Sequence, residues 1–221
     1  MLKYPCLVLD HDDTVVQSEA TLNYPCFCEF LDLYRPGEKL TLDEYINTCS
    51  CQPFVEMCRQ RYGFTEEELQ KEYLFWKDYI RRHTPAPFPG IERIIRRQKE
   101  KGGLVCVVSM SGTENILRDY NAHFGITPDA IYSWDLPDHL RKPSPYSLQH
   151  IMETYYLSPA QLLVVDDMKP GAVMARSVGV PMAFAAWSRL DYPQIMNQME
   201  QISDFTFRNT QELEKFLFWE E

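Results

Sequence analysis

Short runs of apolar residues that stop at polar or acidic residues recur along the chain. The clearest runs are residues 6–9, 104–108, 162–165 and 182–185. Runs of this length are too short for buried helices, and continuous apolar character is typical of parallel strands that are covered on both faces. Ala130 to Trp134 and Phe205 to Phe207 are further candidate strands. The pattern predicts an α/β fold with a parallel sheet of Rossmann type.

Between residues 16 and 85 the apolar spacing changes from that of strands to that of helices. Apolar residues at positions 27, 30, 31 and 34 share one helical face. Pro25 precedes them and predicts a kink or a restart of the helix. Capping-box sequences begin at Thr41 and Thr65, and Pro53 suits the start of another helix. We therefore expect a small helical bundle inserted after the first strand.

The remainder of the chain alternates predicted strands with predicted helices. Three prolines between Pro85 and Gly90 indicate the return from the insertion. Helices are expected from Ile91, from a capping box at Ser111, over Gly171 to Val178, and from Thr210 to near Trp219. The predicted domains are residues 1–15 with 86–221, which form the core, and residues 16–85, which form the helical insertion.

Acidic residues follow the first strand directly. Asp10 and Asp12 lie two positions apart, so both side chains point the same way if the extended backbone continues past the strand. The carboxyl ends of parallel strands are where open α/β sheets bind ligands. A turn cluster or a helix start would also suit these residues.

Three later motifs fall at comparable places. Ser109 follows the second strand, Lys142 precedes a proline and so belongs to a loop, and Asp166 with Asp167 ends the fourth strand. In this order the four motifs resemble those of the haloacid dehalogenase-like hydrolase superfamily. Asp13 departs from relatives with helical caps, which usually carry glycine there. The resemblance implies a Rossmann-like core with an inserted helical cap, similar to phosphoglycolate-phosphatase-like members.

The resemblance also implies a chemistry. Asp10 would attack phosphorus to form an aspartyl-phosphate, and Asp12 would protonate the leaving group and later activate water. Ser109 and Lys142 would bind the phosphate. Mg²⁺ would be held by Asp10, the main-chain carbonyl of Asp12 and Asp167, with Asp166 binding directly or through water.

A metal is also expected from charge alone. Two unit charges about 4 Å apart cost roughly 4 kcal/mol at an effective dielectric near 20. Several carboxylates that converge on a phosphate dianion therefore need a cation, and Mg²⁺ suits a site with few carboxylates and a phosphate oxygen. The expected substrate is a small phosphomonoester.

Two other functions stay open on the sequence. One is a phosphotransferase such as a sugar phosphomutase, and the other is a protein that binds a phosphorylated ligand without catalysis. In β-phosphoglucomutase-like relatives a histidine follows the second motif aspartate by ten residues, and this place falls on Leu22. Water is therefore the expected acceptor. The connection near Cys49 to Pro53 is expected to set specificity, although a plain helix connection would look the same.

Composition narrows the partners. The formal net charge of −10 disfavours a surface for nucleic acid or an anionic membrane. The absence of a long apolar stretch and of a leader-like start favours a cytoplasmic protein. Seven scattered cysteines predict reduced thiols, and the C-x-C pairs at Cys26 and Cys49 lack common zinc spacing. The sequence does not indicate an oligomeric state.

Overall fold

The computed structural model describes residues 2–218, except for the side chains of Ser50 and Cys51. It divides into two compact units. The core unit comprises the chain up to Val16 and from Pro87 onward, and the cap unit comprises Gln17–Ala86. The helix end predicted at Trp219 lies outside the described residues.

The core unit contains a parallel sheet of six strands in the order β3-β2-β1-β4-β5-β6. The strands are β1 (Cys6–Leu9), β2 (Leu104–Val108), β3 (Ala130–Tyr132), β4 (Leu162–Asp166), β5 (Met182–Ala185) and β6 (Phe205–Phe207). This confirms the predicted parallel α/β fold. β3 ends two residues before the predicted Trp134, which lies half exposed in a turn.

Strand register brings three chain segments level at the carboxyl edge of the sheet. Leu9 at the end of β1 pairs with Val107 of β2 on one side and with Val165 of β4 on the other. The Asp10 amide donates to the Val165 carbonyl at 2.9 Å, so the β1–β4 pairing extends one residue beyond the strand. The residues after β1 and β4 are therefore close neighbours.

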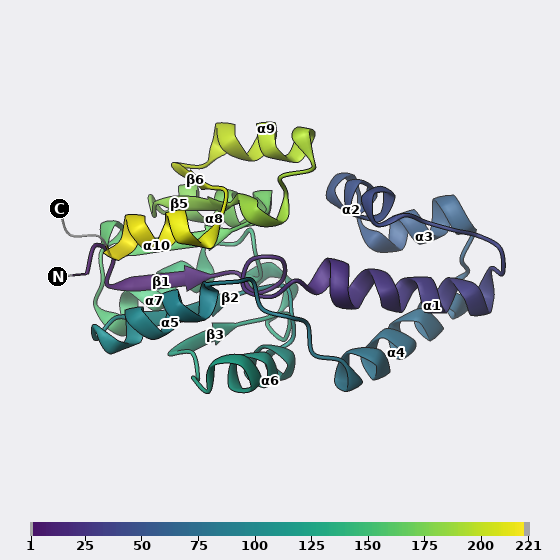
Figure 1. The fold of residues 1–221 in the computed structure, drawn as a ribbon, viewed down its shortest axis with the longest axis horizontal. Coiled ribbons are helices and arrows are strands. Elements are labelled where there is room, and N and C mark those ends of the chain that lie inside the picture. The colour runs from purple at the N-terminus through teal and green to yellow at the C-terminus, as the bar shows by residue number, and fades with distance from the viewer. Residues whose placement is uncertain (1, 219–221) are drawn as a thin grey trace. The chain divides into compact units, whose positions relative to one another are not determined.

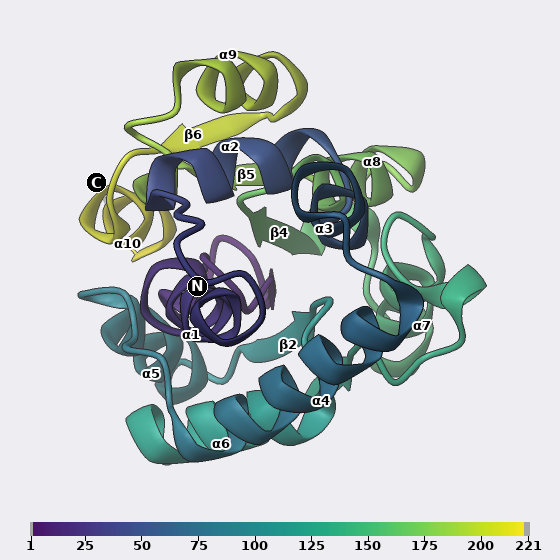
Figure 2. The same cartoon turned by 90° about the vertical axis from the view of Figure 1, so that its right-hand side faces the viewer.

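Helices cover both faces of this sheet. In Figures 1 and 2, α5 and α10 lie on one side of it and α7 and α8 on the other. The core helices are α5 (Ile91–Glu100), α6 (Thr113–Phe124), α7 (Tyr146–Tyr155), α8 (Lys169–Ser177), α9 (Pro193–Ile202) and α10 (Thr210–Phe218), with short 3₁₀ turns η2 (Asp138–Leu140), η3 (Pro159–Gln161) and η4 (Ala186–Ser188). Side chains from α5, α6 and α10 form one buried cluster with Leu7 and Leu9. Burial on both faces explains why the strands are apolar throughout.

Several helix starts differ from the sequence prediction. The expected cap at Ser111 is wrong, because Gly112 is the N-cap of α6 and the Asp135 carboxylate accepts the Thr113 amide at 2.9 Å. Thr210 does not cap α10 from outside, since it lies within the helix and donates to the Pro89 carbonyl. Asn209 instead accepts the Glu212 amide at 2.9 Å. Capping from a distant loop is invisible in a local pattern.

Two core helices were not predicted at all. α7 and α9 begin at prolines or directly after them, within segments whose sequence also suits loops. α8 begins at Lys169, two residues earlier than expected, with Pro170 in its first turn. No helix in the described part of the chain has the length and apolar character needed to cross a membrane.

The cap unit is entirely helical. Its elements are a π-helical turn η1 (Glu19–Asn23), α1 (Tyr24–Tyr34), α2 (Leu42–Cys51), α3 (Phe54–Tyr62) and α4 (Glu66–Arg82). The helix restarts at Tyr24 with Pro25 in its first turn, and both predicted capping boxes are present, at Thr41 and Thr65. Pro53 is the N-cap of α3 and not its first helical residue. The predicted helical bundle is therefore confirmed.

Candidate active site

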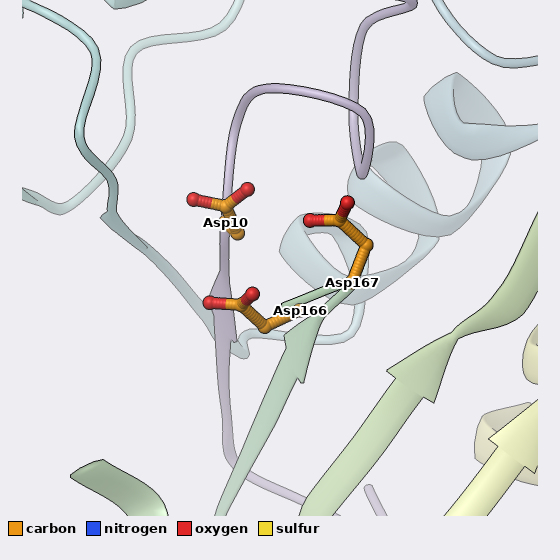
Figure 3. A group of neighbouring side chains, drawn as sticks. All are labelled: Asp10, Asp166 and Asp167. Carbon is orange, nitrogen blue, oxygen red and sulfur yellow. The ribbon is translucent and has the colours of Figure 1, made fainter. Parts of the chain in front are cut away.

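Three buried carboxylates meet at the carboxyl edge of the sheet. Asp10 follows β1, Asp166 ends β4 and Asp167 follows it. One oxygen of each lies within 4.8 Å of the others, and all three residues are buried (Figure 3). The strand register explains this arrangement, because β1 and β4 pair directly.

Lys142 lies between two of these carboxylates. Its Nζ is 2.7 Å from Asp10 Oδ1 and 2.7 Å from Asp166 Oδ2. The residue belongs to the turn before α7, and its side chain is only 5% exposed. Burial acts to lower the pKa of Lys142, but Asp10 and Asp166 outweigh it and raise the pKa above its ordinary value. Lys142 is therefore a buried ammonium ion held by two carboxylates.

Asp166 is fixed from several directions. Its Oδ1 accepts the Met168 amide at 2.9 Å, while its Oδ2 accepts from Lys142. Gly171 in α8 packs directly on this side chain, and a Cβ at that position would lie 2.1 Å from Asp166 Oδ2. A side chain at position 171 would therefore displace the Asp166 carboxylate.

Asp167 is paired with an arginine that sequence reasoning did not identify. Arg189, which follows η4, is 4% exposed, and its Nε lies 2.8 Å from Asp167 Oδ2. Its Nη1 also lies 3.1 Å from Asp13 Oδ2, so one guanidinium joins the two carboxylates. The Thr14 hydroxyl donates weakly to Asp167 Oδ1 at 3.5 Å. Arg189 lies far from Asp13 and Asp167 in the sequence, and no local pattern marks it as their partner.

The charges of this cluster do not cancel. Asp10, Asp13, Asp166 and Asp167 are acidic and only Lys142 and Arg189 are basic, which leaves two negative charges when all six side chains are ionised. Burial raises the pKa values of Asp166 and Asp167 above the ordinary value, and the opposing effects of Lys142 and Arg189 offset this only in part. A divalent cation would supply the missing charge. Buried carboxylate oxygens suit a hard cation such as Mg²⁺.

The oxygens of this cluster are not equally available to a metal. No described donor binds Oδ2 of Asp10, and Oδ1 of Asp167 receives only the long contact from Thr14. Both oxygens of Asp166 already accept hydrogen bonds. Asp10 and Asp167 thus fit direct coordination better than Asp166 does.

Among the described residues, the two remaining candidates, Asp12 and Ser109, form no hydrogen bond or ion pair with the cluster. The Asp12 carboxylate is not one of the grouped acids, and the residue is half buried in the loop after β1. Ser109 is buried directly after β2, where its hydroxyl accepts the Ser111 amide at 3.2 Å. The structure thus brings together Asp10, Lys142, Asp166 and Asp167, and it leaves Asp12 and Ser109 at the margin.

His11 anchors the loop that carries these acids. Its Nε2 lies 3.0 Å from Asp119 Oδ2 of α6, and both side chains are buried. The contact ties the residue between Asp10 and Asp12 to a rigid helix. It is a further contact that the sequence pattern did not reveal.

Most of the chain matches one known protein family. Residues 7–185 match the sequence profile described as haloacid dehalogenase-like hydrolase. No curated protein matches the chain. The matched segment includes the loop after β1, the cap unit and the strands β2 to β5.

Solved structures share the whole fold at low sequence identity. A protein from Haemophilus somnus described as a predicted phosphoglycolate phosphatase has 17% identity and a TM-score of 0.76, covering 98% of this chain and 99% of its own. A haloacid dehalogenase-like protein from Bacteroides fragilis has 19% identity and a TM-score of 0.77, covering 96% and 100%. CbbY from Rhodobacter sphaeroides, solved with phosphate, has 17% identity and a TM-score of 0.70, covering 96% of each chain. At these identities the likeness establishes the fold.

Proposed function

Because the chain belongs to the haloacid dehalogenase-like hydrolase family, we propose that it is an Mg²⁺-dependent phosphomonoester hydrolase for a small phosphorylated metabolite. The observation that carries the proposal is the buried group of Asp10, Asp166 and Asp167 with Lys142 between two of them. This group combines Asp10, at the end of an apolar strand, with the buried ammonium group of Lys142 and an excess of negative charge.

The proposed metal ligands are Asp10 and Asp167, with the main-chain carbonyl of Asp12 and with Asp166 bound directly or through water. Oδ2 of Asp10, which has no described donor, and Oδ1 of Asp167, which has only the long contact from Thr14, support this choice. A bound Mg²⁺ would neutralise charge on the phosphate and polarise its oxygens. Arg189 would hold Asp167 through Oδ2 and keep Oδ1 turned to the metal.

Asp10 is the proposed nucleophile. Lys142 donates to its Oδ1 at 2.7 Å and fixes the direction of the carboxylate. The bond that forms joins an Asp10 oxygen to phosphorus, and the bond that breaks joins phosphorus to the leaving oxygen. Asp12 would give its proton to that oxygen and then take a proton from the attacking water. Its half-buried position outside the carboxylate cluster is compatible with reaching the leaving group.

Lys142 and Ser109 are the proposed phosphate contacts. Lys142 would neutralise phosphate oxygens, and the Ser109 hydroxyl, whose oxygen accepts the Ser111 amide, would donate a hydrogen bond to the phosphate. CbbY, which shares the fold, was solved with phosphate, and this agrees with a phosphate-bearing substrate.

Hydrolysis is proposed over transfer to a second hydroxyl. Leu22, at the place where mutase-like relatives carry a histidine, is buried among apolar residues of the cap unit, in contact with a cluster that includes Cys26 and Ile80. It offers no group to relay a proton. The assignment of specificity to the connection near Cys49 to Pro53 stays a proposal, and the side chains of Ser50 and Cys51 lie outside the described residues.

The test is phosphate release from a panel of small phosphomonoesters, with Mg²⁺ and after chelation. Release that requires Mg²⁺ is expected. A hexose 1-phosphate with a bisphosphate primer, followed by phosphorus NMR, separates the two reactions. Isomerised sugar phosphate that forms faster than free phosphate would refute the hydrolase, and turnover that survives rigorous chelation would refute the metal.

A further inference from the structure

The cap unit contains a cavity that the proposed chemistry does not use. Its volume is about 330 Å³, within the range of small-molecule sites. Residues from η1 and all four cap helices line it. The lining is unusual because five aromatic rings and two carboxylates share it: Phe27, Tyr45, Phe54, Tyr73, Trp76, Glu19 and Glu72.

Glu72 is the notable member of this lining. It lies on α4 and is only 8% exposed. Among the described residues, no side chain or amide forms a hydrogen bond or an ion pair with its carboxylate, and no lysine, arginine or histidine lines the cavity. Its carboxylate lines the cavity without a counter-charge, which favours a proton or a cationic ligand there.

Glu19 adds a second carboxylate on the same cavity, and it is held in place. Trp76 Nε1 donates to Asn23 Oδ1 at 3.0 Å, and Asn23 Nδ2 donates to Glu19 Oε1 at 3.2 Å. This chain fixes both the carboxylate and the indole ring. A polar wall that is ordered before binding lowers the entropy cost of binding.

The aromatic rings supply faces that attract positive charge. Phe27 packs edge-on against Phe54 with ring centres 5.0 Å apart, and Tyr73 stacks on Trp76 at 6.1 Å. Lys77 Nζ already lies 5.6 Å from the centre of the Tyr73 ring. Ring faces attract cations through their quadrupoles, and substituted ammonium groups are typical ligands of such aromatic sites.

From these contacts we propose that the cap unit binds a small organic cation, a substituted ammonium group, with Glu72 as its counter-ion and the aromatic rings around it. An anion would meet two carboxylates. A neutral apolar ligand would leave Glu72 buried without a partner. The binding proposal does not require the hydrolase proposed above, because every lining residue belongs to the cap unit.

Protonation gives the proposal an additional readout. Burial raises the pKa of Glu72 to about 7. A bound cation stabilises the ionised carboxylate, so binding near neutral pH releases a proton to the buffer. Calorimetry in two buffers with different ionisation enthalpies measures that proton directly, with no variant required.

The binding test uses choline and its neutral carbon isostere 3,3-dimethylbutan-1-ol, titrated into the whole protein at about pH 8, where Glu72 is ionised. Choline should bind at least about tenfold more tightly, since the two probes differ mainly in charge. Glu72→Gln keeps the shape of the side chain and should remove this preference. Glu67→Gln, on the same helix with a side chain that is 79% exposed, should keep it.

Equal affinities for choline and the isostere, no binding of either, or a preference unchanged in Glu72→Gln would overturn the proposal. The same chemistry could come from a free cation or from a cationic group on the phosphoester. A lower KM for phosphocholine than for 3,3-dimethylbutyl phosphate identifies the substrate as the source, and equal KM values identify a free cation. Only this comparison rests on the proposed hydrolase, and the binding test needs no turnover.

Discussion

The core and cap units differ in whether their buried carboxylates have charged partners. In the core unit, Asp10 and Asp166 share Lys142, and Asp167 is paired with Arg189. In the cap unit, Glu72 is buried without a counter-charge among the described residues. Removing a charged partner of the core carboxylates should therefore lower the free energy of unfolding, while removing the charge of Glu72 should raise it. Whether a buried carboxylate stabilises or destabilises its unit therefore depends more on its charged partners than on its depth of burial.

The largest effect is expected on turnover at Asp10. Asp10→Asn removes the nucleophile with little change in shape, so kcat should fall by about four orders of magnitude or more, as for other covalent catalysts. Phosphate release under saturating Mg²⁺ measures it. Asp32→Asn, an exposed acid on α1, is the matched control and should stay near wild type. Measurable multiple turnover by a pure Asp10→Asn preparation would exclude Asp10 as the nucleophile.

The largest effect on stability is expected at Lys142. Lys142→Met leaves Asp10 and Asp166 facing each other without the ammonium group, and breaking a buried ion pair costs about 3 to 5 kcal/mol. Urea unfolding monitored by circular dichroism gives the free energy. Lys101→Met, at the exposed end of α5, is the matched control. A loss no greater than that of the control would show that the ion pairs are not needed.

Arg189 tests whether the metal and the arginine balance the same carboxylates. Arg189→Gln should destabilise the metal-free protein by roughly 2 to 4 kcal/mol, since Asp167 and Asp13 lose their common partner. Mg²⁺ should then stabilise the variant against unfolding more than it stabilises the wild type. Urea titrations with and without Mg²⁺ measure both effects. Equal stabilisation by Mg²⁺ in the two proteins would separate Arg189 from the metal site.

Glu72 should show the opposite sign. Because burial raises its folded-state pKa from 4.5 to about 7, the folded protein loses stability as pH rises through that window. Glu72→Gln should therefore gain up to roughly 3 kcal/mol in the cap unit above the upper pKa and nothing below the lower one.

Hydrogen exchange of the α1 and α4 amides reports this gain within the cap unit. Among the described residues, the other titratable groups near Glu72 are Glu19, Tyr45 and Tyr73 in the cavity lining, and Cys26 and Cys58. Burial raises the pKa values of the two thiols and of Tyr45, so these three groups stay neutral over the window. A gain of equal size at both ends of the window would reject the charge explanation.

The smallest effect distinguishes the two acids at the end of β4. Asp167→Ala should raise the Mg²⁺ concentration needed for half-maximal activity at least about tenfold more than Asp166→Ala does. The reason is that both Asp166 oxygens already accept hydrogen bonds, while Asp167 Oδ1 has only the weak contact from Thr14. The reverse order would make Asp166 the direct ligand.

Local sequence was sufficient for much of the sheet and of the cap. β1, β2, β4 and β5 are apolar runs, and Asp10, Ser109 and Asp166 lie at or directly after the ends of the first three. Such runs can be recognised without information from distant residues. The capping boxes at Thr41 and Thr65 are likewise local. The family resemblance then supplied roles that a pattern alone could not assign.

The features that were missed depend on contacts between distant residues. Arg189 reaches Asp167 and Asp13 from the segment after β5, and nothing near it in sequence marks it. Asp135 caps α6 from another loop, in place of the local signal at Ser111. Glu72 looks like an ordinary exposed acid on an amphipathic helix, and only the packing of the cap shows that it is buried. The periodicity of apolar residues does not show which charged side chains meet in the folded protein.

The most direct test of the central claim is to trap the covalent intermediate on Asp10. Asp12→Asn should still be phosphorylated by p-nitrophenyl phosphate, whose leaving group needs little protonation, but it should lose the phosphate slowly. Borohydride reduction followed by peptide mass spectrometry should then find homoserine at position 10, only when Mg²⁺ is present. Continued turnover with no reduced residue, or reduction at a different acid, would contradict the account.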